Sequence, residues 1–167
     1  MGLPMIMHGT EEEMTMKVRE VMSRDVVQIG PAESCLDAVV RMQRARVRHL
    51  PVVNRDGLLV GIVTDRDLRH HLFLPRIFEA LGAKPVQDML DAVHVAEIMS
   101  TDVLTVESDA SLGEAAATMR KNRVGSLPVM DRGRMVGIVT EVDILRQIVR
   151  TDATCTPECA EVIVSYP

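Results

Sequence analysis

Aromatic side chains are nearly missing from this chain of 167 residues, which contains two phenylalanines, one tyrosine and no tryptophan. A hydrophobic core must therefore be aliphatic, although an apolar fraction of 47% is large enough to build one. The shortage also removes the stacking platforms on which proteins bind single-stranded nucleic acid. Because the net charge of −5 disfavours nucleic-acid binding in general, we expect no nucleic-acid partner.

Long apolar runs and a cysteine framework are absent as well. No stretch is long enough to span a bilayer, and the start MGLPMIMHGTEEE lacks the basic and apolar regions of a signal peptide, so we expect no membrane partner. Cys35, Cys155 and Cys159 are an odd number without framework spacing, which favours a reducing cytoplasm over a disulfide scaffold. The last two supply only two ligands where a structural zinc ion needs four, so we expect no metal.

What the sequence does contain is an internal repeat. VREVMSRDVVQIGPAES at 18–34 aligns with VAEIMSTDVLTVESDAS at 95–111, an offset of 77 (95 − 18). RARVRHLPVV at 44–53 aligns with KNRVGSLPVM at the same offset, and GIVTDRD at 61–67 aligns with GIVTEVD at 137–143 at 76 (137 − 61). Because each copy holds roughly 55 residues, a size that rarely folds well alone, the copies should share an interface.

Each copy predicts the same order of elements, β-α-β-β-α. A short helical turn and an extended apolar run lead to Ser34-x-x-Asp37 or Ser111-x-x-Glu114, the capping-box pattern that opens a helix. A hairpin with a glycine in its short loop follows, and then a second helix. The fold class is therefore α/β (α+β), with two repeats packed face to face. We assign 17–73 and 95–150 to the repeats, 74–94 to a helical connector, and 1–16 and 151–167 to poorly ordered tails.

The motif GIVTDRD has two interpretations, and both apply equally to its second copy. In the first, Thr64-x-x-Asp67 is only another capping box, and Gly61 only permits close packing within a strand. In the second, the strand ends at a helix N-terminus, whose free amides and dipole attract an anion. The threonine would then contact phosphate, the aspartate would accept hydrogen bonds from a ribose diol, and the glycine would let a ligand approach the backbone.

The two copies resemble a tandem pair of CBS domains, the module named for cystathionine β-synthase. The resemblance rests on VMSRDVVQI, RHLPVV, the Asp-Gly hairpin and GIVTDRD, each repeated in weaker form. It implies a pseudo-two-fold unit that binds AMP, ADP, ATP or S-adenosylmethionine and forms a homodimer. The residues that it implies are Thr64 and Thr140 for phosphate, Asp67 and Asp143 for ribose, and Val26, Val27, Val103 and Leu104 for the base pockets.

The copies differ in charge beside the Leu-Pro of each hairpin. The equivalent positions hold Arg46, Arg48 and His49 in one copy, and Arg123, Gly125 and Ser126 in the other. Arginine and histidine can grip phosphates, so we count all of these except the glycine as candidate ligand contacts. Two alternatives stay open: the arginines are solvated at a helix end, and the histidine is a packed, neutral imidazole. If the groups do bind phosphate, they serve either their own repeat or the other one.

We therefore expect a cytoplasmic, homodimeric sensor that binds an adenosine-type ligand between the repeats and needs no cofactor. The sequence offers no nucleophile paired with a base, so we do not expect an enzyme. The alternative is a ligand-free module for dimerisation or partner binding. For the dimer, we expect the apolar helix face of Leu36, Val39 and Met42 to need a partner.

Overall fold

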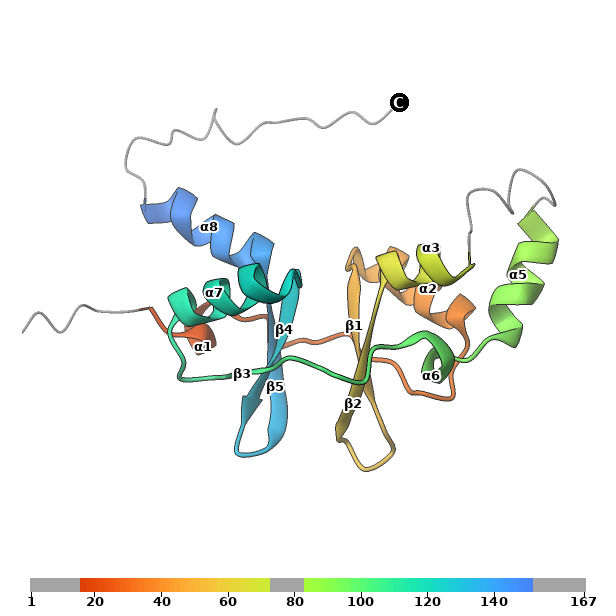
Figure 1. The fold of residues 1–167 in the computed structure, drawn as a ribbon, viewed down its shortest axis with the longest axis horizontal. Coiled ribbons are helices and arrows are strands. Elements are labelled where there is room, and N and C mark those ends of the chain that lie inside the picture. The colour runs from red at the N-terminus through yellow and green to blue at the C-terminus, as the bar shows by residue number, and fades with distance from the viewer. Residues whose placement is uncertain (1–15, 73–82, 152–167) are drawn as a thin grey trace, which may run out of the picture.

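The computed structural model describes residues 16–72 and 83–151, which form two similar halves (Figure 1). The antiparallel hairpins β1–β2 and β4–β5 lie side by side in the middle, with the helices outside them. Mixed helices and small sheets confirm the α+β class. In chain order the elements are α1 (Val18–Val21), α2 (Cys35–Ala45), β1 (His49–Val53), β2 (Leu59–Thr64), α3 (Asp65–Leu72), α5 (Ala83–Ala92), α6 (Val95–Ile98), β3 (Val106–Glu107), α7 (Leu112–Asn122), β4 (Ser126–Asp131), β5 (Arg134–Thr140) and α8 (Glu141–Thr151).

Capping boxes open α2 and α7, as predicted. Ser34 Oγ accepts a hydrogen bond from the Asp37 amide at 3.1 Å, and the Asp37 carboxylate accepts one from the Ser34 amide at 3.3 Å. Ser111 and Glu114 repeat the pattern at the start of α7. Both helices end at an arginine in the left-handed region, with φ of 54° at Arg46 and 57° at Arg123. These turns direct the chain from each helix into its hairpin.

The hairpins match the prediction, including the glycine in each loop. Gly57 and Gly133 have φ of 78° and 76°, a region that glycine enters without strain. The register places His49 opposite Thr64 in the first hairpin. Ser126 stands opposite Thr140 at the same point of the second hairpin. The start of one strand and the end of the next thus meet at the open end of each hairpin, opposite the loop.

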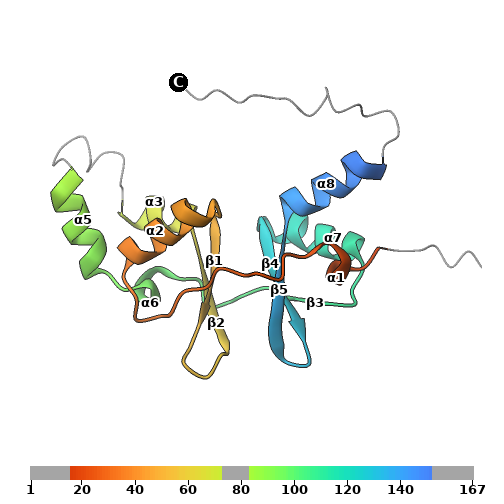
Figure 2. The ribbon, with the colours of Figure 1, turned by 180° about the vertical axis from the view of Figure 1, so that it is seen from behind.

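The second repeat has the predicted order β-α-β-β-α, from β3 to α8, but the extended run that opens each repeat pairs as a strand over a shorter length than expected. In the first copy Ile29 makes a single parallel bridge to Val52, and in the second the strand has two residues, Val106–Glu107. The run cannot follow one sheet because it crosses between the halves. Ser23 bridges Ile138 in the second hairpin before the chain reaches the first, and Figure 2 shows this crossing from behind.

The crossing exchanges the short helices between the halves. Val18 of α1 is fully buried in the core of the second hairpin, where α1 contacts β5 and α8. Val95 and Ile98 of α6 are buried in the core of the first hairpin, where α6 contacts β2 and α3. A packed half is therefore one sequence repeat with the opening helix of the other. We call the first half β1, β2, α2, α3, α5 and α6, and the second half β3, β4, β5, α1, α7 and α8.

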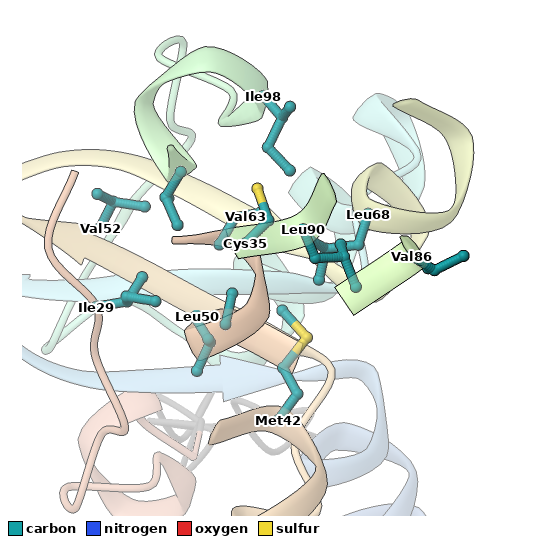
Figure 3. Packing of buried hydrophobic residues seen from close by; sticks show 12 residues of the cluster. Ile29, Cys35, Met42, Leu50, Val52, Val63, Leu68, Val86, Leu90 and Ile98 are labelled. Carbon is teal, nitrogen blue, oxygen red and sulfur yellow. The ribbon is translucent and has the colours of Figure 1, made fainter. Parts of the chain in front are cut away.

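The core of the first half is aliphatic, as the composition requires (Figure 3). Met42 is 6% exposed within it, and Leu36 and Val39 pack against it while partly buried. The apolar face of α2 thus packs in part on the protein's own core, which weakens the reason given for a homodimer, and the homodimer itself stays a prediction. The connector contributes α5, whose Val86 and Leu90 are buried in the same cluster. The rest of the predicted connector, at 74–82, lies outside the described residues.

Cys35 is fully buried in this core, as a small apolar residue. Burial, with a smaller contribution from Glu97, raises the pKa of its thiol from 9.0 to about 11. Because the thiolate is the reactive form, we expect maleimide to label Cys35 in the native protein about a hundredfold more slowly than in urea. The assay uses a variant with Cys155→Ser and Cys159→Ser, since both lie outside the described residues. Equal rates in the two states would show that the thiol is accessible.

Candidate functional site

A cleft of about 880 Å³ lies between the two halves. This volume falls within the range of small-molecule sites, roughly 300–1,000 Å³. The structure brings every site residue that the sequence predicted to this one cleft. Those of the first repeat are Val26, Val27, Arg46, Arg48, His49, Thr64 and Asp67, and those of the second are Val103, Leu104, Arg123, Ser126, Thr140 and Asp143.

The Thr-x-x-Asp motifs stand at the N-termini of α3 and α8, on the wall of this cleft. Asp67 Oδ2 accepts hydrogen bonds from the Thr64 amide at 2.9 Å and from its hydroxyl at 2.7 Å. Asp143 accepts the same two bonds from Thr140, at 2.9 and 2.7 Å. The capping-box interpretation thus holds in both copies. The threonine protons are already donated, so a contact from either hydroxyl to a phosphate requires the hydroxyl to turn.

The first amides of α3 are used unequally. The amide of Asp65 donates to the Arg48 carbonyl at 3.1 Å, and the amide of Asp67 donates within the capping box. Among the hydrogen bonds of the described residues, none uses the amide of Arg66 between them. The same pattern opens α8, where the remaining amide belongs to Val142. Each helix therefore keeps one donor at the positive end of its dipole, which is what a bound anion needs.

The glycines of the motif face the crossing chain, which corrects the idea that they admit a ligand. A Cβ atom on Gly61 would lie 2.5 Å from Met99 Sδ. One on Gly137 would lie 2.7 Å from Met22 Sδ and 2.9 Å from the Ser23 carbonyl oxygen. The glycines are required because the crossing segments pack directly on the strands.

The charges of the cleft are nearly balanced, and some are already paired. Asp65 binds Arg69 at 3.0 Å, and Asp143 Oδ1 lies 3.5 Å from Arg146. The sequence reasoning missed these pairs, and it also missed two acids that precede the apolar runs, Asp25 and Asp102. Their signal was present, because the two acids align at the repeat offset of 77 (102 − 25). The other lining residues that were not predicted are Ser23, Val47, Ile62, Ser100, Val124, Gly125, Ile138, Glu141 and Val142.

His49 is half-buried on the wall of the cleft. Burial lowers the pKa of its imidazole, and Arg48 lowers it further, against the opposing effects of Asp65, Glu141 and Asp67. Its position supports both earlier interpretations at once, since a packed, neutral imidazole lines the cleft. The described residues contain no cluster of three or more metal-ligating side chains. Within the same ranges, no helix has the length and apolarity needed to cross a bilayer.

The family model of the CBS domain matches this chain twice, at residues 18–74 and 95–150. The chain is a tandem pair of CBS domains. A CBS domain-containing protein of Dictyostelium discoideum is 35% identical over 153 residues, covering 87% of this chain and 99% of the relative. The resemblance seen in the sequence is thereby confirmed.

Other CBS relatives place this module inside larger proteins or show it with ligands. The inosine-5′-monophosphate dehydrogenase of Methanocaldococcus jannaschii is 32% identical over 132 residues, which are 78% of this chain but only 23% of that enzyme. A solved CBS domain pair in complex with 5′-methylthioadenosine and S-adenosyl-L-methionine has a TM-score of 0.67 at 27% identity. That match covers 80% of this chain and 96% of the other. The similarity to the dehydrogenase therefore concerns about a quarter of the enzyme.

Proposed function

We propose that this CBS pair is a regulatory sensor that binds an adenosine-type ligand in the cleft between its halves. The observation that carries the proposal is the placement of two equivalent helix N-termini, each with a Thr-x-x-Asp motif, on one cleft of about 880 Å³. The similar CBS pair solved with two adenosine derivatives supports the same class of ligand.

Each part of such a ligand has a matching group in the cleft. Val26, Val27 and Val103 offer partly buried aliphatic surface to a flat base. The ribose hydroxyls suit the Asp67 carboxylate, which is an acceptor with two oxygens. Phosphates suit the open amide of Arg66 and the exposed guanidinium of Arg46. The second half supplies equivalent groups, so we expect each chain to bind two ligands.

A thermal-shift screen of the full chain with adenosine, AMP, ATP and S-adenosylmethionine tests this proposal. A ligand that binds only the native state adds about 2.7 kcal/mol of stability at a hundred times its Kd. We expect at least one of the four to raise the melting temperature, with GTP as the control for base selectivity. If none raises it at millimolar concentration, the sensor proposal is wrong.

The alternative function, a module for dimerisation or partner binding, is favoured by one face of α8. Val142, Leu145 and Val149 are each between 41% and 58% exposed, and their spacing of three and four residues places them on one side of the helix. We propose that this face, rather than the face of α2, forms a homodimer. We also propose a cytoplasmic location, because an odd number of cysteines without framework spacing suits a reducing compartment. Neither proposal requires an enzymatic activity.

Leu145→Glu is expected to convert the homodimer into a monomer, because a charge would replace a side chain that is 58% exposed in the monomer and buried in the dimer. Multi-angle light scattering at micromolar concentration measures the change. Leu58→Glu is the matched control, since Leu58 is 51% exposed at the far end of a hairpin and should leave the dimer intact. A wild-type monomer would contradict the dimer proposal.

A further inference from the structure

An imidazole of the first repeat and a carboxylate of the second lie close to the same point of the cleft. A Cβ atom on Gly125 would lie 3.3 Å from His49 Nε2 and 3.5 Å from Glu141 Oε2. The imidazole of the first half and the carboxylate of the second therefore both lie against the same glycine. His49 also stands opposite Thr64 in the hairpin register, so it is adjacent to the motif at the start of α3.

The equivalent point of the second repeat has a different chemistry. At the offset of 77, Ser126 replaces His49 (49 + 77), and Gly125 replaces Arg48 (48 + 77). Ser126 stands opposite Thr140 in the same register, and it is buried. Among the described residues that line the cleft, the one histidine is therefore supplied by the first repeat. The glycine opposite leaves the space that this ring uses.

The surroundings of this imidazole disfavour its charged form. Burial disfavours the imidazolium most, and Arg48, the preceding residue, disfavours it as well, while Asp65 and Asp67 of α3 and Glu141 of α8 favour it. The net result is a lowered pKa of the His49 ring, so the ring is mostly neutral at pH 7 in the ligand-free protein. An anion that enters the cleft adds negative charge and favours the imidazolium. A cation does the opposite.

We propose that His49 is a specificity-determining residue that takes up a proton from solvent when a phosphate-bearing nucleotide fills the cleft. The proposal rests on the proposed function and deepens it by naming the charge class of the ligand. Because the complex then binds one more proton than the free protein, affinity for an anionic nucleotide rises as the pH falls. Affinity for uncharged adenosine stays constant by the same relation, and affinity for the cationic S-adenosylmethionine falls. The ratio of the affinity for the nucleotide to the affinity for S-adenosylmethionine therefore rises as the pH falls.

Calorimetric titrations of the full chain with ATP, adenosine and S-adenosylmethionine at pH 6, 7 and 8 test this. One proton changes affinity by at most tenfold per pH unit, so we expect ATP to bind about three- to tenfold more tightly at pH 6 than at pH 8, relative to His49→Gln. The comparison with the variant removes the titration of ATP itself. His94→Gln, at an exposed histidine that does not line the cleft, should behave like the wild type. Titrations in two buffers of different ionisation enthalpy count the proton directly.

The outcomes separate this inference from the function on which it rests. If ATP binds and the wild type and His49→Gln have the same pH dependence and the same proton count, the inference is overturned and the sensor function stands. If no ligand binds at any pH, both fail. An NMR titration of the wild type keeps the test independent of a variant that folds poorly. Saturating ATP should raise the pKa of the His49 ring, and an unchanged pKa would also overturn the inference.

Discussion

Gly137→Ala is expected to lower the free energy of unfolding by about 2–3 kcal/mol, near the upper end for overpacking a closely packed site. The added methyl would lie 2.9 Å from the Ser23 carbonyl oxygen, which is backbone and cannot rotate away. That carbonyl accepts a hydrogen bond from the Ile138 amide at 3.0 Å, and the Ser23 amide returns one at 2.9 Å. The substitution therefore strains the bridge that fixes the crossing chain. Urea denaturation measures the loss.

Two further alanine variants control this result. Gly61→Ala should cost less, because its closest contact at 2.5 Å is the thioether of Met99, a flexible side chain, and the Ser100 carbonyl is farther, at 3.2 Å. Gly113→Ala should stabilise the protein by up to about 1 kcal/mol, since it lies in α7 with no atom closer than 3.9 Å. An equal loss in Gly137→Ala and Gly113→Ala would show that the crossing chain does not press on the strand.

The local elements were predictable because their signals are local. Ser34 and Ser111 each stand three residues before an acidic residue, and both capping boxes form. The glycine in each hairpin loop marked the turn in the same way. The long-range features carried no such signal. Nothing near Ser23 indicates that its backbone bridges Ile138, more than a hundred residues later, and the expected first strand was therefore drawn too long.

The sequence predicted which residues line the candidate site, but not the hydrogen bonds that they make in the structure. Both Thr-x-x-Asp motifs reach the cleft, yet the spacing that suits a nucleotide also suits a capping box, and the structure shows the box. The role of Gly61 was misjudged because the residue pressing on it, Met99, comes from the other repeat. The dimer argument from Leu36 is weakened for a related reason, since periodicity shows that a helix face is apolar but not which surface covers it, and Leu36 packs in part on the protein's own core.

Asp67→Ala and Asp143→Ala should each abolish one of two ligand sites and leave the other, which is the sharpest consequence of the pseudo-two-fold cleft. Hydrogen bonds to a charged group contribute about 1.5–3 kcal/mol, so affinity at the altered site should fall by roughly ten- to a hundredfold. Each variant also loses a helix cap, at about 1 kcal/mol. Asp143 should show the larger loss of stability, because it is only 9% exposed and also binds Arg146. Calorimetry with the ligand found in the screen gives the stoichiometry, and melting curves give the stability.

Asp37→Ala separates the two roles of these carboxylates. Asp37 occupies the same capping-box position in α2, but it does not line the cleft. Its substitution should destabilise the protein as the loss of a cap does, while ligand stoichiometry stays at two. If Asp67→Ala and Asp143→Ala behave like Asp37→Ala, with lower stability and unchanged binding, the two motifs are helix caps alone. In that case the double variant Asp67→Ala/Asp143→Ala is titrated as well. If it still binds a nucleotide, other groups of the cleft hold the ribose, and if it does not, the two carboxylates can replace each other.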